Sequence, residues 1–266
     1  MTVYEDLIFE VNGSIATITL NRPEAFNAIS DRMRNELRHI IDCLNADEEI
    51  RIVIITGAGK AFCAGGDIKL MKQNIEKNLS YRERLDTYRR DVAGMVKEMR
   101  GIRQLVIAKI NGAAFGAGLS IAMLCDIRIA AATAKFGMPF GKRGLVPDWG
   151  SLYFLPRLVG ATKAIALTAT GRSFNARKAL DVGLIDEMVD SEQLNNFVDL
   201  YCADILQSSP LSVIESKQAF YQNMSCELDT ALENEARVQS KCYCSDDHRE
   251  GVECFLEKRA AKFTGK

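Results

Sequence analysis

The pattern of hydrophobic and polar residues predicts several short strands in the first half of the chain. Residues 7–20 alternate between apolar and polar positions in two runs joined by an Asn-Gly pair, which is typical of a β-hairpin. Residues 51–56 and 105–110 are largely apolar runs, as expected of buried parallel strands, and residues 127–131 are a further run of this kind. These runs predict a sheet of mostly buried strands.

Helical periodicity separates these strands. Ser30 is placed to cap a helix over residues 31–46, whose apolar positions recur on one face. Residues 71–100 are also helical in pattern but highly charged, which favours a solvated face. Strands followed by glycine turns and helices predict an α/β fold of repeated β-β-α or β-α units. Beyond residue 161 the pattern predicts helices over residues 162–170, 176–182, 191–207, 210–224, 229–243 and 249–263.

Residues 109–126 are the stretch around which the rest of the chain is organised. A strand ends there at an Asn-Gly pair, and the small residues 113–118 are predicted to open a helix. The first amides of a helix have no intrahelical partner, and the macrodipole places about half a positive charge there, so this turn can hold a developing anion. Gly116 and Gly118 are equally compatible with a purely structural role, in which they let the helix pack tightly against the sheet. A third glycine at dinucleotide-binding spacing is absent from this sequence.

A similar turn is expected earlier, in residues 60–70. Gly65 and Gly66 stand directly before Asp67, whose side chain can cap the following helix. We therefore interpret Asp67 as a cap rather than as a catalyst. The amide of Gly66 is expected to point out of its strand-to-helix turn much as that of Ala117 does.

Residues 136–160 are rich in prolines and glycines and are predicted to form loops. Loops of this length in compact domains are usually functional or disordered, and this one is too apolar for disorder. Asp148 lies in it beside Trp149 and follows three apolar residues. A carboxyl group in such surroundings is poorly solvated, which raises its pKa toward the working range of a base. The alternative is an exposed turn aspartate after a proline.

Composition narrows the classes of function. The 266 residues are 47% hydrophobic and 26% charged, enough for one large or two small domains with a substantial core. With a formal net charge of -1, the chain has no excess of positive charge that would favour binding to nucleic acid or to an anionic membrane. No apolar run reaches 18 residues, and residues 1–10 lack the basic segment of a signal peptide, so we expect a cytoplasmic protein.

The eight cysteines are spaced without the pattern of a zinc site, and no metal site is expected. We expect reduced thiols, with Cys63 and Cys125 buried because their neighbours are apolar. Neither of the two histidines lies in a glycine-rich loop, so a histidine base is not expected.

Five segments in chain order resemble the crotonase, or enoyl-CoA hydratase/isomerase, superfamily. They are AFCAGGDIK at residues 61–69, KINGAAFGAGLSIAMLCDIRIA at 109–130, KFGMPFGKRGLVPDWGSLYFLPRLVG at 135–160, ALTATGRSFNARKALDVGLIDEMV at 166–189 and EGVECFLEKR at 250–259. The resemblance implies a crotonase-like spiral of β-β-α units that binds acyl-CoA over residues 1–195, and a helical C-terminal trimerisation region over residues 196–266. It further implies a homotrimer or a dimer of trimers, a role in lipid or aromatic acid degradation, and no cofactor beyond the coenzyme A of the substrate.

The resemblance also implies catalytic residues. The amides of Gly66 and Ala117 would form an oxyanion hole around the thioester oxygen, which agrees with their place at strand-to-helix turns. Family hydratases carry two glutamates, at positions that hold Ser120 and Phe140 here, so a plain hydratase is not expected. Asp148 matches the catalytic aspartate of family isomerases that move a double bond, and a single base suits a 1,3-proton shift. We therefore expect an enoyl-CoA isomerase.

Further substrate contacts are expected on the same basis. Family positions that meet the CoA nucleotide hold Lys69, Phe255 and Lys258 in this sequence, although plain solvation is the usual fate of a single lysine. The candidates for the acyl pocket, for which ordinary core packing is the alternative, are Phe115, Phe140 and Trp149. The remaining candidates for substrate binding are Ala64, Asp67, Ile68 and Ser120.

Other functions stay open at this point. A hydratase, or a ring-opening or thioester hydrolase, would raise the mass of the product by one water. A noncatalytic acyl-CoA-binding member of the family would show no turnover, and an RNA-binding member is disfavoured by the near-neutral charge. The aroyl-CoA dehalogenases of the family use a histidine from the helix after the first oxyanion turn, whereas residues 67–100 contain no histidine.

Overall fold

The structure is a computed structural model and describes residues 4–266. Residues 1–3 lie outside the described residues. They are part of the predicted domain over residues 1–195 and of residues 1–10, in which no signal peptide is expected. The chain forms two compact units. The first comprises the described residues up to Ile102 together with Val106–Val198, and the second comprises Arg103–Leu105 and Asp199–Lys266.

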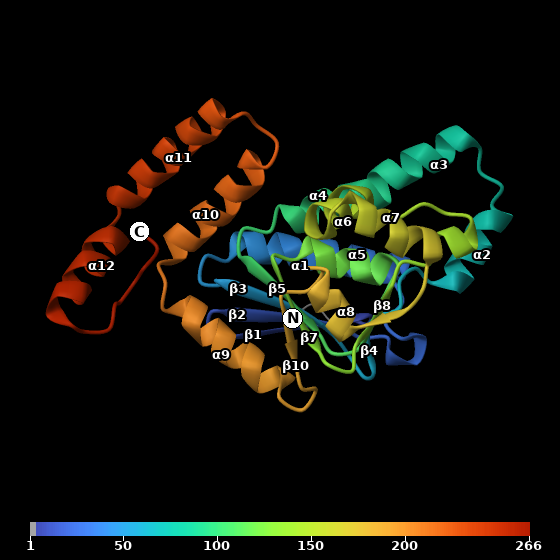
Figure 1. The fold of residues 1–266 in the computed structure, drawn as a ribbon, viewed down its shortest axis with the longest axis horizontal. Coiled ribbons are helices and arrows are strands. Elements are labelled where there is room, and N and C mark those ends of the chain that lie inside the picture. Colours follow the sequence, from blue (N-terminus) through green and yellow to red (C-terminus); the bar gives the residue numbers. More distant parts are fainter. Residues whose placement is uncertain (1–3) are drawn as a thin grey trace. The chain divides into compact units, whose positions relative to one another are not determined.

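The first unit is built around a six-stranded sheet (Figure 1). Its strands are β1 (Leu7–Asn12), β2 (Ile15–Leu20), β3 (Ile52–Gly57), β5 (Leu105–Ile110), β7 (Ile127–Ala131) and β10 (Glu187–Val189), in the order β1-β2-β3-β5-β7-β10. β1 and β2 form the predicted antiparallel hairpin, whereas β2 runs parallel to β3, and β7 runs parallel to both β5 and β10. The strands predicted in the first half of the chain are thus confirmed.

A second sheet holds much shorter strands, namely β4 (Ala61–Cys63), β6 (Ala113–Phe115), β8 (Lys135–Gly137) and β9 (Phe174–Asn175). β3, β5 and β7 of the first sheet are each followed by a strand of this second sheet and then by a helix. The predicted β-β-α repeat is confirmed. Because β4 pairs in parallel with β6, and β6 with β8, the turns that leave these strands lie at the same edge of the small sheet.

Helices follow the strands of the first unit. In α1 (Asp31–Ala46) the Ser30 side chain accepts a hydrogen bond from the Met33 amide at 2.9 Å, and the apolar stripe of the helix is buried, as predicted. Each such buried side chain stabilises the fold by about 1.5–3 kcal/mol. The others are α2 (Ile68–Glu76), α3 (Tyr81–Tyr88), the π-helical turn Arg89–Ala93, α4 (Gly94–Arg100), α5 (Ala117–Leu124), α6 (Ser151–Val159), α7 (Ala161–Thr170), α8 (Ala176–Asp181) and α9 (Leu194–Leu206), which continues into the second unit.

The second unit is helical over most of its length. Its remaining helices are α10 (Pro210–Asn223), α11 (Leu228–Tyr243) and α12 (Asp246–Glu257). The last helix begins at Asp246, within the Asp246-Asp247-His248 run that was expected to start it, but its predicted end at residue 263 is wrong, because it stops at Lys258, which has a left-handed φ of 54°. The tail then folds back, since the Asp247 carboxylate accepts hydrogen bonds from the backbone amides of Thr264 and Gly265.

Two predictions for the first unit are also wrong in detail. Residues 113–118 do not open a helix directly, because residues 113–115 form β6 and the helix begins at Ala117. Residues 136–160 are rich in loop, as predicted, but they also contain the end of β8 and the whole of α6. Three-residue strands carry too little local pattern to be predicted, and these form because strands of neighbouring repeats lie beside them.

The interior of the first unit is apolar and contains two of the free thiols. Cys63 and Cys125 are buried, as predicted, and burial raises the pKa of Cys63 to about 12, so that this thiol is inert. Within the described part of the chain, no helix is at once long enough and apolar enough to cross a bilayer.

Candidate active site

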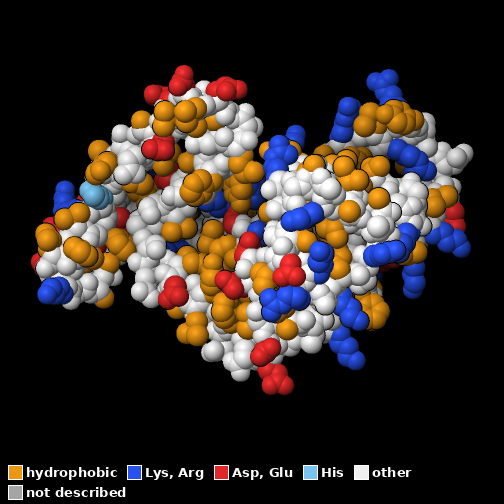
Figure 2. All heavy atoms as spheres, in the orientation of Figure 1, with side chains coloured by type: hydrophobic (Ala, Val, Ile, Leu, Met, Phe, Trp, Pro, Cys, Tyr) orange, Lys and Arg blue, Asp and Glu red, His pale blue; other side chains and the backbone are white. Residues whose placement is uncertain are grey.

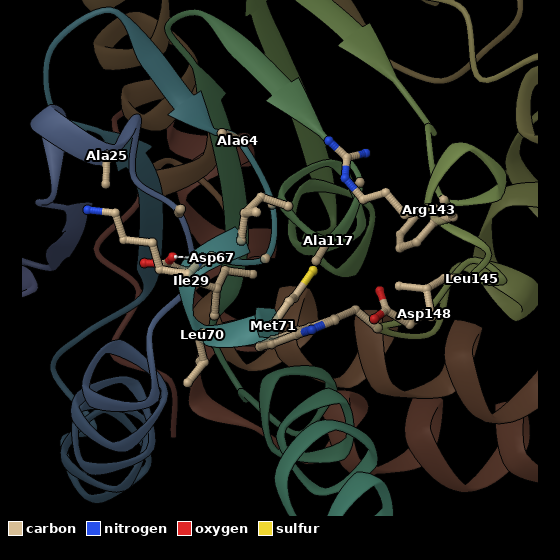
Figure 3. Close-up of a pocket in the computed structure, with 18 of the residues that line it drawn as sticks. Ala25, Ile29, Ala64, Asp67, Leu70, Met71, Ala117, Arg143, Leu145 and Asp148 are labelled. Carbon is tan, nitrogen blue, oxygen red and sulfur yellow. Dashed lines mark hydrogen bonds between the residues drawn. The ribbon is translucent and has the colours of Figure 1, made fainter. Parts of the chain in front are cut away.

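A cavity of about 580 Å³ opens in the first unit where the strand-to-helix turns meet, and its size is that of a small-ligand site. Figure 3 shows Asp148 and Leu145 on one side of it and Leu70 on the opposite side, with Ala117 between them. The lining comes from parts of residues 22–34, 64–74, 116–117 and 139–149, and from Val92.

Gly66 is one of the residues that line this cavity. It forms a single parallel bridge with Ile29, in which Ile29 donates to the Gly65 carbonyl at 2.8 Å and accepts from the Asp67 amide at 3.4 Å. In this pattern the N–H and C=O of Gly66 itself point away from Ile29. The Gly66 amide is therefore not used in the bridge to Ile29, which is compatible with its predicted role as a donor to a ligand.

Ala117 is the first residue of α5 and also lines the cavity. A helix offers no partner to its first N–H, so this amide too is available to a ligand. The helix start is pressed against β4, since a Cβ on Gly118 would lie 2.2 Å from the backbone oxygen of Cys63. Gly118 therefore has the packing role that the sequence left open. A Cβ on Gly65 would lie 3.3 Å from the Ala117 nitrogen, so the two turns adjoin.

Asp148 is a poorly solvated carboxyl group on the cavity wall. One oxygen, Oδ1, is buried without a hydrogen-bond partner in the described structure. Burial raises the pKa of Asp148 to about 6, against the smaller opposing effect of its own backbone amide. The sequence prediction that this carboxyl group is desolvated, rather than exposed in a turn, agrees with the structure.

Trp149 follows Asp148 in the chain, and Tyr88 lies near enough to feel the charge of the Asp148 carboxylate. Trp149 is buried and has a left-handed φ of 51°, which is uncommon for a bulky residue. Burial and then the negative charge of Asp148 raise the pKa of Tyr88, while a hydrogen bond from the Trp149 amide lowers it. The Tyr88 hydroxyl therefore stays protonated beside the aspartate at neutral pH. No pattern in the sequence marks Tyr88 as a site residue.

Asp67 is the predicted cap of α2. Its side chain accepts a hydrogen bond from the Lys69 amide at 2.9 Å, and the Arg22 guanidinium donates to it at 3.1 Å. Burial opposes ionisation of this carboxyl group, but the hydrogen bonds from Arg22 and the backbone outweigh it and lower the pKa of Asp67. Asp67 thus stays an ionised, paired cap, which confirms that interpretation.

Several residues of the cavity lining were not predicted, and three of them, Met71, Asn74 and Val92, belong to the stretch interpreted as a solvated face. Apolar side chains among charged neighbours are the signal that marks them, as with Met71 and Val92. The terminal methyl of Met71 lies against Gly66, because a Cβ on that glycine would be 2.5 Å from it. The overlooked lining residues include Arg22, Arg34, Leu70, Met71, Asn74, Val92, Arg143 and Leu145.

The structure brings most of the predicted site residues together. Those that line the cavity are Ala64, Gly66, Asp67, Ile68, Lys69, Ala117, Phe140, Asp148 and Trp149. Phe255 and Lys258 belong to the second unit, which is described by itself.

Two predicted substrate contacts lie outside the described lining of this cavity. The ring of Phe115 packs at Gly137, where a Cβ would be 2.7 Å from it. Ser120 is buried and its hydroxyl is hydrogen-bonded to Ser151, because its position on α5 turns it toward α6. For these two residues the periodicity of the backbone, rather than their place in the motif, decides what they contact.

Comparison with known proteins gives the family. The chain matches the family model for enoyl-CoA hydratase/isomerase over residues 10–266. It is 36% identical over 255 residues to the short-chain-enoyl-CoA hydratase of Clostridium acetobutylicum, covering 96% of this chain and 95% of that one. It is 35% identical over 262 residues to the 1,2-epoxyphenylacetyl-CoA isomerase of Escherichia coli, covering 98% of this chain and 99% of that one.

Solved structures agree with this assignment. The crystal structure of an enoyl-CoA hydratase from Bacillus anthracis matches with a TM-score of 0.91 at 30% identity, covering 98% of this chain and 100% of that chain. The paired sheets and the repeated β-β-α units are thus those of a known fold. The chain belongs to the enoyl-CoA hydratase/isomerase family of the crotonase superfamily.

Proposed function

We propose that this family member is an isomerase that moves a double bond in an acyl-CoA through a thioester enolate. One observation carries the proposal: Asp148 lines the cavity with a pKa raised to about 6. A general base is most effective when its pKa lies near the working pH, and a well-placed one contributes about 10²–10⁴ in rate. Asp148 would serve as both base and acid.

In this mechanism Asp148 removes a proton from carbon 2 of a 3-enoyl-CoA. The electrons of that C–H bond form a double bond between carbons 1 and 2, and the thioester oxygen takes the negative charge. The amides of Gly66 and Ala117 donate to this oxygen, and each such donor contributes about 3 kcal/mol. Asp148 then returns the proton to carbon 4, which leaves the double bond between carbons 2 and 3.

The other carboxyl groups in the described lining are less suited to this role. Glu24 is exposed, and Asp67 is held ionised by Arg22 at the start of α2. Ser120 and Phe140 stand where family hydratases carry their glutamates, and neither side chain titrates as a carboxyl group does. A single desolvated carboxyl group favours a proton shift within the substrate over addition of water.

Hydration is the second candidate, because relatives in both comparisons are named hydratases. Water addition raises the product mass by one water, whereas isomerisation leaves the mass unchanged. The same criterion separates a ring-opening hydrolase, and a noncatalytic acyl-CoA-binding protein would leave every substrate unchanged.

The decisive experiment compares the wild type with Asp148→Asn in deuterated water. The panel consists of 3-enoyl-, 2-enoyl- and aryl-epoxide-CoA thioesters, and label and mass are followed by mass spectrometry. We expect the wild type to form the isomer without a gain of water, with deuterium at carbon 4 only to the extent that the Asp148 proton exchanges with solvent before it is returned. The variant should lose about 10²–10⁴ in turnover while it still binds acyl-CoA. Asp181→Asn, at the exposed end of α8, is the matched control. Unchanged turnover in Asp148→Asn, or a product heavier by one water, refutes the isomerase assignment.

We further propose that the enzyme needs no cofactor beyond the CoA of its substrate, because the thioester itself makes the neighbouring protons acidic. We also propose a cytoplasmic homotrimer or dimer of trimers that acts in lipid or aromatic acid degradation. The predicted nucleotide contacts, Lys69, Phe255 and Lys258, belong to this proposal.

A further inference from the structure

Two buried serines connect the two sides of the candidate site without lining its cavity. Ser120 lies on α5, the helix that begins at Ala117, and Ser151 is the first residue of α6, which follows the Asp148 loop. α5 and α6 contact each other (Figure 1), and both serines are completely or almost completely buried. Their Oγ atoms are 2.6 Å apart.

The number of protons limits the direction of these hydrogen bonds. The Ser120 hydroxyl donates to the Gly116 carbonyl at 3.1 Å. Either hydroxyl could donate across the 2.6 Å contact, and while the single Ser120 proton lies on the Gly116 carbonyl the donor is Ser151. The Gly116 carbonyl also accepts the Ser120 backbone amide at 3.0 Å. The series of hydrogen bonds therefore ends on the Gly116 carbonyl. This carbonyl belongs to the same peptide group as the Ala117 N–H.

The other end of this series of hydrogen bonds is connected to Asp148, the residue proposed as the base. The Ser151 backbone amide donates to the Asp148 carbonyl at 3.0 Å. A continuous series of contacts thus runs from the Asp148 backbone through Ser151 and Ser120 to the Gly116–Ala117 peptide. Ser120 and Ser151 are 31 residues apart in the sequence, and the packing of α6 on α5 brings them together.

We propose that Ser120 and Ser151 form a positioning bridge that orients and polarises the Gly116–Ala117 peptide and holds it in register with Asp148. Hydrogen bonds accepted by a peptide carbonyl strengthen the N–H of the same peptide as a donor. The bridge would therefore make the Ala117 amide a better partner for a developing oxyanion. Catalytic donors must also be held within about 0.5 Å of their productive place, which a buried bridge between two helices provides.

This bridge deepens the proposed function and rests on it for the reaction itself. The serine hydroxyls do not line the cavity, so their removal should affect the transition state more than the binding of the substrate. A bridge that merely stabilised the fold would lower the melting temperature and leave kcat unchanged. The two roles can thus be separated by experiment.

The test uses Ser120→Ala, Ser151→Ala and the double variant of the full-length protein. We expect each single variant to lose roughly 10-fold in kcat with KM changed less than about twofold, and the double variant to lose no more than about twofold beyond the worse single one, because the residues act as one unit. Thr56→Val is the matched control. It removes a buried hydroxyl that donates to the Lys109 carbonyl at 2.8 Å, outside the cavity lining.

A second measurement does not depend on turnover. A saturated acyl-CoA, labelled with carbon-13 at the thioester carbonyl, is bound to each protein, and its chemical shift reports the hydrogen bonds at that oxygen. We expect a downfield shift in the wild type, in Thr56→Val and in Asp148→Asn, and a smaller shift in both serine variants. An unchanged shift and kcat in the serine variants, or equal losses in Thr56→Val, overturn the bridge.

The two proposals fail in different ways. If Asp148→Asn abolishes isomerisation but the serine variants match the wild type, the isomerase assignment stands and the bridge is wrong. If the wild type turns over no 3-enoyl-CoA but the serine variants still lose the carbonyl shift, the bridge stands and the assigned reaction is wrong.

Discussion

Asp148 is a carboxyl group whose ionisation is opposed by its surroundings, and a base must be ionised to act. Its pKa of about 6 predicts that kcat/KM for the double-bond shift rises as the pH increases through about 6 and levels off above about 7. The measurement is the pH profile of kcat/KM in the free enzyme. Acyl-CoA affinity, measured over the same range, should show no matching rise. A profile that stays flat between pH 5 and pH 8 contradicts the role of Asp148.

The same raised pKa predicts an effect on stability. The folded state favours the neutral carboxyl group, so its stabilising contribution is present below the unfolded pKa near 3.8 and is lost as the pH rises through about 6. Asp148→Asn removes this loss and should stabilise the protein at pH 8 by about 1–3 kcal/mol, and at pH 5 by roughly half as much. Thermal unfolding of both proteins at fixed concentration tests this. A gain in stability that is the same at pH 5 and pH 8 would show that ionisation of Asp148 is not its cause.

At the scale of elements, the contact of α5 with β4 determines where the Ala117 amide lies. A Cβ on Gly118 would lie 2.2 Å from the Cys63 backbone oxygen, whereas a Cβ on Gly66 would meet only the flexible end of Met71 at 2.5 Å. Gly118→Ala should therefore destabilise the protein by about 2–4 kcal/mol, and Gly66→Ala by less than about 1 kcal/mol. Thermal unfolding of the pair measures the difference.

Gly66→Ala is the control for Gly118→Ala, because both variants add one methyl group at a turn of the same cavity. Equal stability of the two proteins would show that α5 can withdraw from β4. Such a helix could not hold the Ala117 amide in a fixed position.

The side of the cavity formed by α2 is kept in place by different interactions from the side formed by α5. None of its residues is buried, and its first turn depends on the hydrogen bond that Asp67 accepts from the Lys69 amide. A helix with so little buried surface opens more readily than the core. The cavity therefore has one side fixed by packing and one side fixed mainly by a cap.

At the scale of the whole molecule, the second unit carries apolar side chains that a single chain leaves in water. Figure 2 shows hydrophobic side chains on the surfaces of α11 and α12. The exposed apolar residues of this unit include Phe220 (72%) on α10, and Phe255 (82%) and Leu256 (74%) on α12. Exposed apolar groups of this extent indicate a protein contact. We predict a mass of three or six times the 29.5 kDa of one chain in solution, measured by light scattering.

Charged substitutions test which surface makes that contact. Phe220→Asp and Leu256→Asp should lower the mass, whereas Val11→Asp, at an exposed site on the β1–β2 hairpin, should not. A monomer in the wild type, or an unchanged mass in both variants of the second unit, contradicts the predicted assembly.

Much of the fold was determined by local sequence. The Ser30 cap and the apolar stripe of residues 31–46 specify α1, because a capped amphipathic helix buries the same face in almost any fold. The apolar run at residues 51–56 likewise specifies β3. The apolar neighbours of Asp148 were enough to predict a desolvated carboxyl group, and the Gly65-Gly66 pair before Asp67 was enough to predict a turn and a cap.

Tertiary structure alone decided the remaining features. β6 and β8 exist because other repeats pair with them, and no local pattern of three residues encodes such a partner. The contact between Ser120 and Ser151 depends on the packing of two helices, so the motif position of Ser120 predicted a substrate contact where the fold made a bridge. The sequence determined which groups are chemically able to act, through their local polarity and periodicity. Long-range packing decided which of them meet, because a distance between residues remote in the chain is not a local property.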